Sequence, residues 1–288
     1  MTPTDYEAIA RDAGLERVGA RPPLGQYLAE MWRRRAFATS LAKFRIQAQM
    51  SENRLGLAWV VLNPLLMAAL YGTIFGIILP RETRPDGVNF VPFVIVGVFI
   101  FQFFSKSFAD GAKSITGNAS LVRSLNFPRM LLPLALIIQQ LIELIPMLLV
   151  MGIIVLGFGE PLTWWWLLVI PTMLLMAMFN LGIALLAARL TVHIRDLTQV
   201  IPLITRLFFY ASGIFYSLEE VLSDQPEWML WVAQVNPVHD YITIVRDLIL
   251  GGINAPGWMW FVASGAAVVT LAVGIVFFWR AEERYGHD

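Results

Sequence analysis

The sequence predicts an all-α polytopic membrane protein, and three observations support this fold class. Of the 288 residues, 57% are hydrophobic and only 15% are charged, whereas soluble domains carry about 25% charged residues. The mean hydropathy of the chain is +0.65. Apolar runs recur along the chain at about the 20 residues that a helix needs to cross the hydrocarbon core of a bilayer. These features exclude a soluble globular domain.

Six apolar runs have the length of a transmembrane helix. We place these spans at residues 57–79, 90–108, 130–157, 164–188, 199–217 and 258–279. Their orientation follows from the basic residues, because Lys and Arg concentrate in cytoplasmic loops. With both termini in the cytoplasm, only Arg81, Arg84 and Arg246 of the 21 Lys and Arg residues lie on the outer side. The opposite orientation is therefore rejected.

Two segments precede the first span. Residues 1–23 are polar, include Pro22-Pro23 and predict a cytoplasmic tail. Residues 24–52 predict a helix, because short apolar faces recur at helical spacing with basic residues between them. Such an amphipathic interface helix is typical of the cytoplasmic membrane surface, although an ordinary soluble helix has a similar pattern. Residues 53–288 then form the six-span transmembrane domain.

A short patterned stretch separates the second and third spans. Asn118 is placed to cap a helix in which Leu121, Val122 and Leu125 share one face, and Pro128 ends that helix. The apolar face lies where two spans leave the membrane. It suits either a protein partner or the layer of lipid headgroups.

The outer segment 218–257 predicts two amphipathic helices before the last span. Pro226 opens the first helix, and Asn236-Pro237 supplies an N-cap and a first-turn proline for the second. The residues that characterise this pair of helices are Trp228, Trp231, Asn236, Pro237, Tyr241 and Ile244. The pattern fits a re-entrant hairpin in the outer leaflet or a helical cap lying flat on the membrane.

Polar side chains within the spans are candidates for function, because they are costly in a bilayer. Glu143 in span three either pairs with a neighbouring helix or relays protons. Arg206 in span five either extends to the membrane surface or meets an anionic group of a substrate in a polar conduit. The aromatic run that begins at Phe208 either faces the lipid boundary or stacks on sugar rings.

Several motifs are absent from the sequence. The motif G-x-x-x-x-G-K-[ST] does not occur, so if ATP powers this chain, the ATPase is a separate polypeptide. There is no cysteine, and His193, His239 and His287 lack metal-ligand spacing, so no metal site is predicted. No nucleophile–base arrangement points to an enzyme. The formal net charge of zero predicts no nucleic-acid partner.

Four segments in consistent order resemble the membrane subunit of polysaccharide ABC exporters. The residues that carry the resemblance are RLGLAW and LNPL within 54–65, the stretch 118–129 that ends in NFPR, RDL at 195–197, and the stretch 236–247. They are similar to that family's first span, coupling helix, inner loop after span four and outer hairpin, respectively. The resemblance covers nearly the whole chain after the tail.

The resemblance implies a homodimer of this chain with two copies of a separate ABC ATPase that binds ATP and Mg²⁺, while this permease chain holds no cofactor. The implied cargo is a polysaccharide on a polyprenyl diphosphate carrier, such as O-antigen, teichoic acid, capsule or galactan, which crosses the bacterial cytoplasmic (inner) membrane. The alternatives are an ABC exporter of drugs or small lipids, an ion-coupled transporter that uses Glu143, and a membrane enzyme acting on lipid-linked sugars.

The resemblance and the side-chain chemistry together suggest roles for particular residues. The expected contacts with the ATPase are Asn118, Leu121, Val122, Arg123, Leu125, Phe127 and Arg129. The expected sugar-stacking rings of a channel are Tyr71, Phe75, Phe208, Tyr210, Phe215 and Tyr216. The carrier diphosphate is expected to meet Arg206, Arg54 and Arg45. The expected outer gate comprises Trp228, Trp231, Asn236, Pro237, Tyr241 and Ile244.

Overall fold

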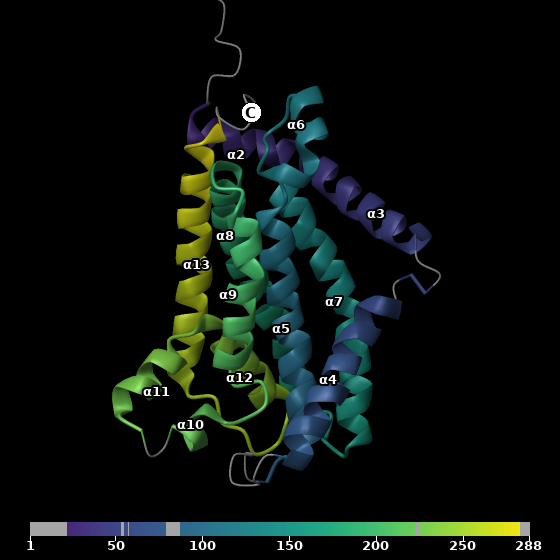
Figure 1. Ribbon diagram of the computed structural model, residues 1–288, viewed down its shortest axis with the longest axis vertical. Coiled ribbons are helices and arrows are strands. Elements are labelled where there is room, and N and C mark those ends of the chain that lie inside the picture. Colours follow the sequence, from purple (N-terminus) through teal and green to yellow (C-terminus); the bar gives the residue numbers. More distant parts are fainter. Residues whose placement is uncertain (1–21, 53–54, 57, 79–86, 223–224, 283–288) are drawn as a thin grey trace, which may run out of the picture.

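The computed structural model describes residues 22–52, 55–56, 58–78, 87–222 and 225–282, and every regular element within them is a helix (Figure 1). The all-α class is therefore confirmed for the described part of the chain. The predicted tail up to residue 21, and Arg54 among the predicted diphosphate contacts, lie outside the described residues.

The helices form an upright bundle with shorter elements at its two ends. The elements are α2 (Leu24–Arg33), α3 (Arg35–Glu52), α4 (Ala58–Ile78), α5 (Phe90–Ala112), η2 (Thr116–Asn118), α6 (Ala119–Ser124), α7 (Leu131–Gly157), η3 (Trp164–Leu168), α8 (Val169–His193), α9 (Leu197–Ala211), α10 (Leu218–Val221), α11 (Glu227–Gln234), α12 (Pro237–Ile249) and α13 (Gly257–Trp279). Helices α2, α3 and α6 lie at one end, which we call the α6 end (Figure 1). Helices α10, α11 and α12 lie at the opposite end, which we call the α12 end.

Four helices in the described residues are long and apolar enough to cross a membrane, namely α5, α7, η3 with α8, and α13. Two further apolar stretches are shorter, Ala58–Tyr71 in α4 and the whole of α9. The fifth predicted span was expected to continue to residue 217. Instead α9 ends at Ala211, because the chain turns at Gly213, whose φ is +62°. The 15 residues of α9 span only about 22 Å.

Residues 24–52 form two helices rather than the single predicted one. The helix breaks at Arg34, which has non-helical ψ and closes α2 by donating its backbone N–H to Glu30 and Trp32. Helix α3 then runs diagonally along the outside of α7 (Figure 1). The corner between α2 and α3 sets the direction of α3 relative to the bundle.

The packed face of α3 consists of small and branched residues. Ala38, Ala42 and Ile46 are buried at a spacing of four residues, which is one face of a helix. Phe44 of the same helix lies outside this packed face, since 67% of its surface is exposed. Small side chains allow α3 to approach α7 closely.

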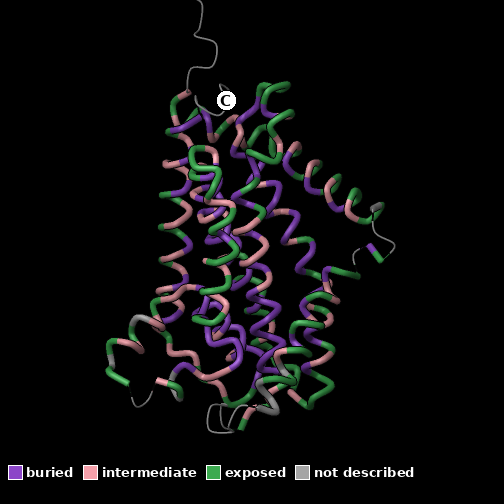
Figure 2. The backbone as a smooth tube through the Cα atoms, viewed as in Figure 1, coloured by how far each residue is buried: buried purple, intermediate pink, exposed green. Residues whose placement is uncertain are grey.

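The body of the bundle is formed by α5, α8 and α13. Helix α5 contacts α4, α7, α8, α9 and α12, so most of its side chains are buried (Figure 2). Helices α8 and α13 meet at two glycines, Gly182 and Gly274. A Cβ atom at Gly182 would lie 2.4 Å from the backbone carbon of Thr270, so only glycine permits this approach.

Helix α12 is enclosed by the bundle, where it packs on α5, α8 and α13. The predicted start of this helix is confirmed: the Asn236 side chain accepts a hydrogen bond of 3.1 Å from the Val238 N–H, and Pro237 occupies the first turn. Tyr241 and Ile244 are fully buried. This burial does not fit a cap lying flat on the membrane, whereas the neighbouring α11 is exposed at Trp228 and Trp231.

Candidate functional site

The connection between α5 and α7 stands beyond the ends of both helices at the α6 end (Figure 1). Helix α6 is shorter than predicted and ends at Ser124. Leu125 has extended φ and ψ of −125° and 139°, so the prediction that it shares a helical face with Leu121 and Val122 is wrong. Pro128 restricts only the residue directly before it, Phe127, so the extended geometry of Leu125 does not follow from the proline.

Asn118 does not cap α6, contrary to the prediction. Its side-chain amide donates to the Ser114 carbonyl at 2.7 Å, and its Oδ1 accepts from Nη2 of Arg45 at 3.2 Å. Asn118 thus links α3 to the chain that leaves α5. The same contact occupies Arg45, one of the residues predicted to meet a diphosphate.

Two of the four predicted ATPase contacts with apolar side chains are covered by the chain itself. Val122 and Phe127 are buried, and the Phe127 ring packs on Phe37 of α3 with centroids 5.0 Å apart. Phe127 is therefore not available to a partner, which corrects the prediction, and Val122 offers only a small part of its surface, along the wall of a cleft. Leu125, which is 50% exposed, and the exposed Arg123 remain on the surface.

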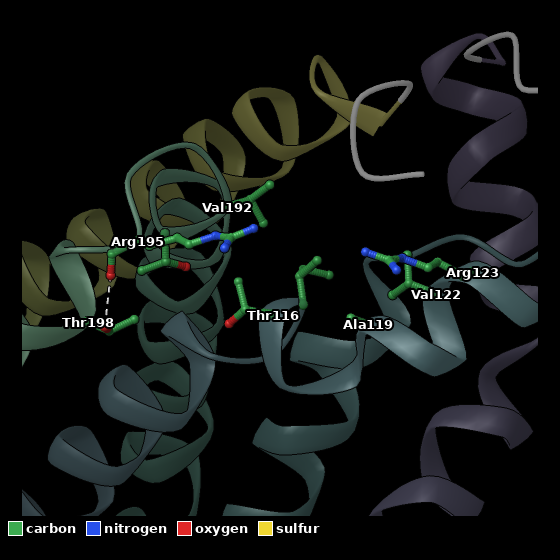
Figure 3. Close-up of a pocket in the computed structure, with 9 residues that line it drawn as sticks. Thr116, Ala119, Val122, Arg123, Val192, Arg195 and Thr198 are labelled. Carbon is green, nitrogen blue, oxygen red and sulfur yellow. Dashed lines mark hydrogen bonds between the residues drawn. The ribbon is translucent and has the colours of Figure 1, made fainter. Parts of the chain in front are cut away.

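A cleft of about 460 Å³ separates α6 from the connection between α8 and α9. Arg123 and Arg195 extend into it from opposite walls (Figure 3). The other lining residues are Ile115, Thr116, Ala119, Val122, Thr191, Val192 and Thr198, so none of the described lining residues is acidic. A carboxylate or phosphate matches this pair of guanidinium groups, because the planar arginine fork donates two parallel hydrogen bonds.

Arg129, predicted to contact the ATPase, is instead held inside the chain. Its Nη1 donates to the backbone carbonyl of Glu282 at 2.6 Å, and its backbone N–H donates to Glu282 Oε1 at 3.1 Å. The Tyr27 hydroxyl donates to Glu282 Oε2 at 2.9 Å. Burial raises the pKa of the Glu282 carboxyl, although these hydrogen bonds oppose the shift. The carboxylate joins α2, the start of α7 and the end of α13.

Glu143 pairs with a neighbouring helix, as one of its two interpretations predicted. Its Oε2 lies 3.0 Å from Nζ of Lys106 on α5, and Gln139 donates to its Oε1 at 2.9 Å. Gln140 and Asp110 form a second contact of 3.4 Å between α7 and α5. These partners explain the presence of a buried carboxylate in α7 by packing between helices, without a role in proton transfer.

The predicted channel rings do not share one environment. Phe215 is fully buried beneath Tyr71, with ring centroids 5.0 Å apart, so its assignment to a channel surface of this chain is wrong. Phe208 packs on Phe104 of α5. Tyr210 is exposed, and the Tyr216 hydroxyl donates to the Tyr210 carbonyl. The side chain of Phe75 lies outside the described residues.

Arg206 lies on the exposed face of α9. The neighbouring side chains on this face are Leu203, Leu207 and Tyr210, each of which has a large exposed surface. Helix α4 also exposes a run of apolar residues, including Leu66 and Leu70. The exposed apolar faces of α4 and α9 are therefore suited to contact with lipid or with a second chain.

The residue that sequence reasoning missed is Arg246 of α12, which is only 3% exposed. Its guanidinium donates to the carbonyl of Phe93 at 3.0 Å, of Gly213 at 2.9 Å and of Ile214 at 2.8 Å, and it stacks 3.4 Å from the Phe93 ring. The orientation rule counted Arg246 only as a charge on the outer side. No pattern in the sequence indicates the turn at Gly213, and this turn presents the carbonyls of Gly213 and Ile214 to Arg246.

Comparison with known proteins identifies the family. Residues 38–250 match the model of the ABC-2 type transporter family, and this range includes both arginines of the cleft and all of α12. The chain belongs to this family. The match leaves out α2, the whole of α13 and Glu282.

Relatives of this ABC-2 transporter are named as polysaccharide export proteins. The chain is 29% identical over 211 residues to the O-antigen export system permease protein RfbA of Klebsiella pneumoniae, which covers 72% of this chain and 77% of the relative. It is 28% identical over 217 residues to the RfbA protein of Myxococcus xanthus, covering 74% and 80%. It is 23% identical over 240 residues to the polysialic acid transport protein KpsM of Escherichia coli, covering 83% and 90%.

Proposed function

We propose that this ABC-2 transporter is the membrane subunit of an ATP-driven exporter that moves a lipid-linked polysaccharide to the outer face of the bacterial cytoplasmic membrane. The observation that carries the proposal is the alignment of O-antigen and polysialic acid export proteins along most of the chain. O-antigen, capsule, teichoic acid and galactan belong to the proposed class of cargo, carried on a polyprenyl diphosphate.

The energy comes from a separate ATPase, in two copies, on a homodimer of this chain. The sequence has no phosphate-binding loop of its own, which supports this division. We assign the α6 end, and with it both termini, to the cytoplasm. The projecting α6, the exposed Leu125 and the arginine-lined cleft, whose wall includes the largely buried Val122, then form the docking surface for the ATPase, in place of the buried Phe127.

The conduit for the polymer lies between the two copies, along the exposed faces of α4 and α9. Tyr210 supplies a ring for sugar stacking, and Arg206 on the same helix meets the carrier diphosphate. Helices α11 and α12 form the outer gate, with the exposed Trp228 and Trp231 as its moving part. The ion-coupled alternative gains no support, because Glu143 is engaged with Lys106.

Transport in inverted membrane vesicles tests the proposal. Vesicles that hold this chain and its ATPase are expected to take up a labelled lipid-linked polysaccharide only when ATP is present. Uptake driven by a proton gradient without ATP would establish the ion-coupled alternative. ATP-driven uptake of small lipids or drugs, with none of the polymer, would assign the chain to the other class of ABC exporter.

Coupling is tested separately by the double substitution Arg123→Gln with Arg195→Gln. Loss of two charge-assisted hydrogen bonds is expected to weaken ATPase binding and export about tenfold. The matched control is Lys43→Gln with Lys113→Gln, which removes two exposed charges at the same end but outside the cleft. Equal ATPase recovery on pull-down from the double variant and the wild type would exclude the cleft as a docking surface.

A further inference from the structure

A second cleft lies at the corner between α2 and α3, where both helices meet α7, and encloses about 650 Å³. Its walls are Met31, Trp32, Arg33, Arg35, Ala36 and Thr39, and its floor is Leu134 and Ile138 of α7. None of these residues belongs to α4, α6 or α9, so the cleft is separate from the proposed conduit and from the arginine cleft beside α6.

The cationic groups at this corner are arranged around an indole. The guanidinium of Arg35 lies 4.9 Å from the Trp32 ring and donates to the Trp32 carbonyl at 3.1 Å, while Trp32 is 67% exposed. The middle arginine, Arg34, is turned away toward Glu30 and Asn126. The guanidinium of Arg33 makes no hydrogen bond or ion pair with the described residues. Two arginines therefore face the cleft without a carboxylate among its described lining residues.

The floor of the cleft continues as an apolar track down the membrane. Beyond Leu134 and Ile138, one face of α7 exposes Ile142, Ile145, Leu149 and Ile153 at intervals of three or four residues. The track from Leu134 to Leu149 is about 22 Å long at the helical rise per residue. That length suits an extended fatty acyl chain, and the mean hydropathy of the α7 window is 2.2.

From this combination we propose that the corner binds an anionic phospholipid of the bilayer, with its phosphate between Arg33 and Arg35 and an acyl chain on the α7 track. Paired arginines beside an exposed tryptophan at a membrane surface are suited to anionic lipid headgroups. An acidic protein segment would satisfy the arginines but leave the apolar track uncovered. A bound lipid would hold the α2–α3 corner against α7 and so fix the direction of α3.

The test is lipid binding to the purified full-length chain, followed by native mass spectrometry with phosphatidylglycerol and phosphatidylcholine. The wild type is expected to bind phosphatidylglycerol about tenfold more tightly than phosphatidylcholine. Arg33→Gln with Arg35→Gln is expected to abolish this preference, and Arg33→Lys with Arg35→Lys is expected to keep most of it. The control Lys43→Gln with Lys113→Gln is expected to behave as the wild type. Equal affinity of the wild type for the two lipids, or an unchanged preference in the Gln variant, would overturn the site.

Two competitors separate the possible sources of phosphate. Inorganic phosphate is expected to leave bound phosphatidylglycerol in place, because it cannot occupy the apolar track. If it competes at the same concentration as a short-chain phosphatidylglycerol, the corner is a plain anion site and the proposal fails. If undecaprenyl phosphate displaces phosphatidylglycerol at equal concentration, the site belongs to the export substrate instead. If a variant does not purify as one species, the proposal is tested by the wild type alone, through its relative affinity for the two lipids and through the two competitors.

This lipid site does not depend on the identity of the exported polymer. The Arg33 and Arg35 variant is expected to lose lipid and keep the ATPase, and the Arg123 and Arg195 variant is expected to do the reverse. Loss of ATPase binding in both variants would show that the corner acts through the docking surface rather than as a lipid site.

Discussion

Arg246 at the α12 end and the two arginines of the cleft at the α6 end have opposite environments. At the α12 end, Arg246 is buried and donates to three backbone carbonyls of the chain itself. At the α6 end, Arg123 and Arg195 are exposed and extend into an open cleft. The first arrangement satisfies the polar groups of a turn inside the bundle, and the second offers charge to a partner. Burial, rather than residue type, separates an arginine that stabilises the fold from one that serves binding.

The comparison extends to the helices that carry these residues. Helix α12 is enclosed by α5, α8 and α13, so a change there affects the packing of the whole bundle. Helix α6 has six residues and stands beyond the bundle (Figure 1). Substitutions at the α12 end should therefore reduce stability, whereas substitutions of exposed groups at the α6 end should alter binding and leave stability nearly unchanged.

The largest loss of stability is expected from Arg246→Met. The carbonyls of Phe93, Gly213 and Ile214 would lose a charged donor, which costs about 3 kcal/mol or more. Thermal unfolding of the purified chain measures the loss. The matched control is Arg206→Met on the exposed face of α9, for which a change within about 0.5 kcal/mol is expected. Equal losses of stability from the two substitutions would contradict the view that the buried Arg246 stabilises the fold and the exposed Arg206 does not.

A smaller difference is expected between two glycines. A Cβ atom at Gly97 would lie 2.5 Å from Nη2 of Arg246, whereas a Cβ atom at Gly117 meets nothing within 4 Å. Gly97→Ala should therefore displace the guanidinium and cost about 1–3 kcal/mol. Gly117→Ala should be neutral or slightly stabilising, because alanine restricts the unfolded chain. A lower melting temperature for Gly117→Ala than for Gly97→Ala would show that the α6 end is the more tightly packed.

The smallest effect is a pH dependence at Glu282. Burial raises the folded-state pKa of this carboxyl above its ordinary value of 4.5, so between the two values the folded chain binds more protons than the unfolded chain. Stability should therefore fall as the pH rises through this window. Glu282→Gln removes the titrating group, so the melting temperature of the wild type relative to this variant should decrease as the pH rises above about 4.5. A relative melting temperature that rises with pH would mean that the hydrogen bonds from Tyr27 and Arg129 outweigh burial.

Several features of the fold were predictable because they depend on nearby residues. Asn236 and Pro237 start α12 as predicted, since an N-cap and a first-turn proline act within one turn. Helical spacing places Tyr241 and Ile244 on one face of α12, but burial extends around the helix to Asp240, Ile242 and Arg246, and only the packing of α12 against its neighbours decides that. The single helix over residues 24–52 and the long α6 were wrong, since neither the break at Arg34 nor the straightening at Leu125 leaves a strong local pattern.

The candidate site was predicted less well, because exposure depends on what covers a side chain. Val122 and Phe127 had the pattern of a docking face, yet α3 covers the Phe127 ring through Phe37. Arg129 looked available at the end of a loop, but it meets Glu282 from the far end of the chain. Arg195 was recognised only as part of a family resemblance, and the fold places it across a cleft from Arg123.

The sequence by itself determined the membrane class, the helical character and the family resemblance. These follow from composition, periodicity and short motifs, which act over a few residues. Only the tertiary structure decided which arginines are buried and which are exposed. That outcome depends on groups far apart in the chain, such as Arg246 and the Phe93 carbonyl, that come together when the bundle packs and must then satisfy one another's hydrogen bonds away from water.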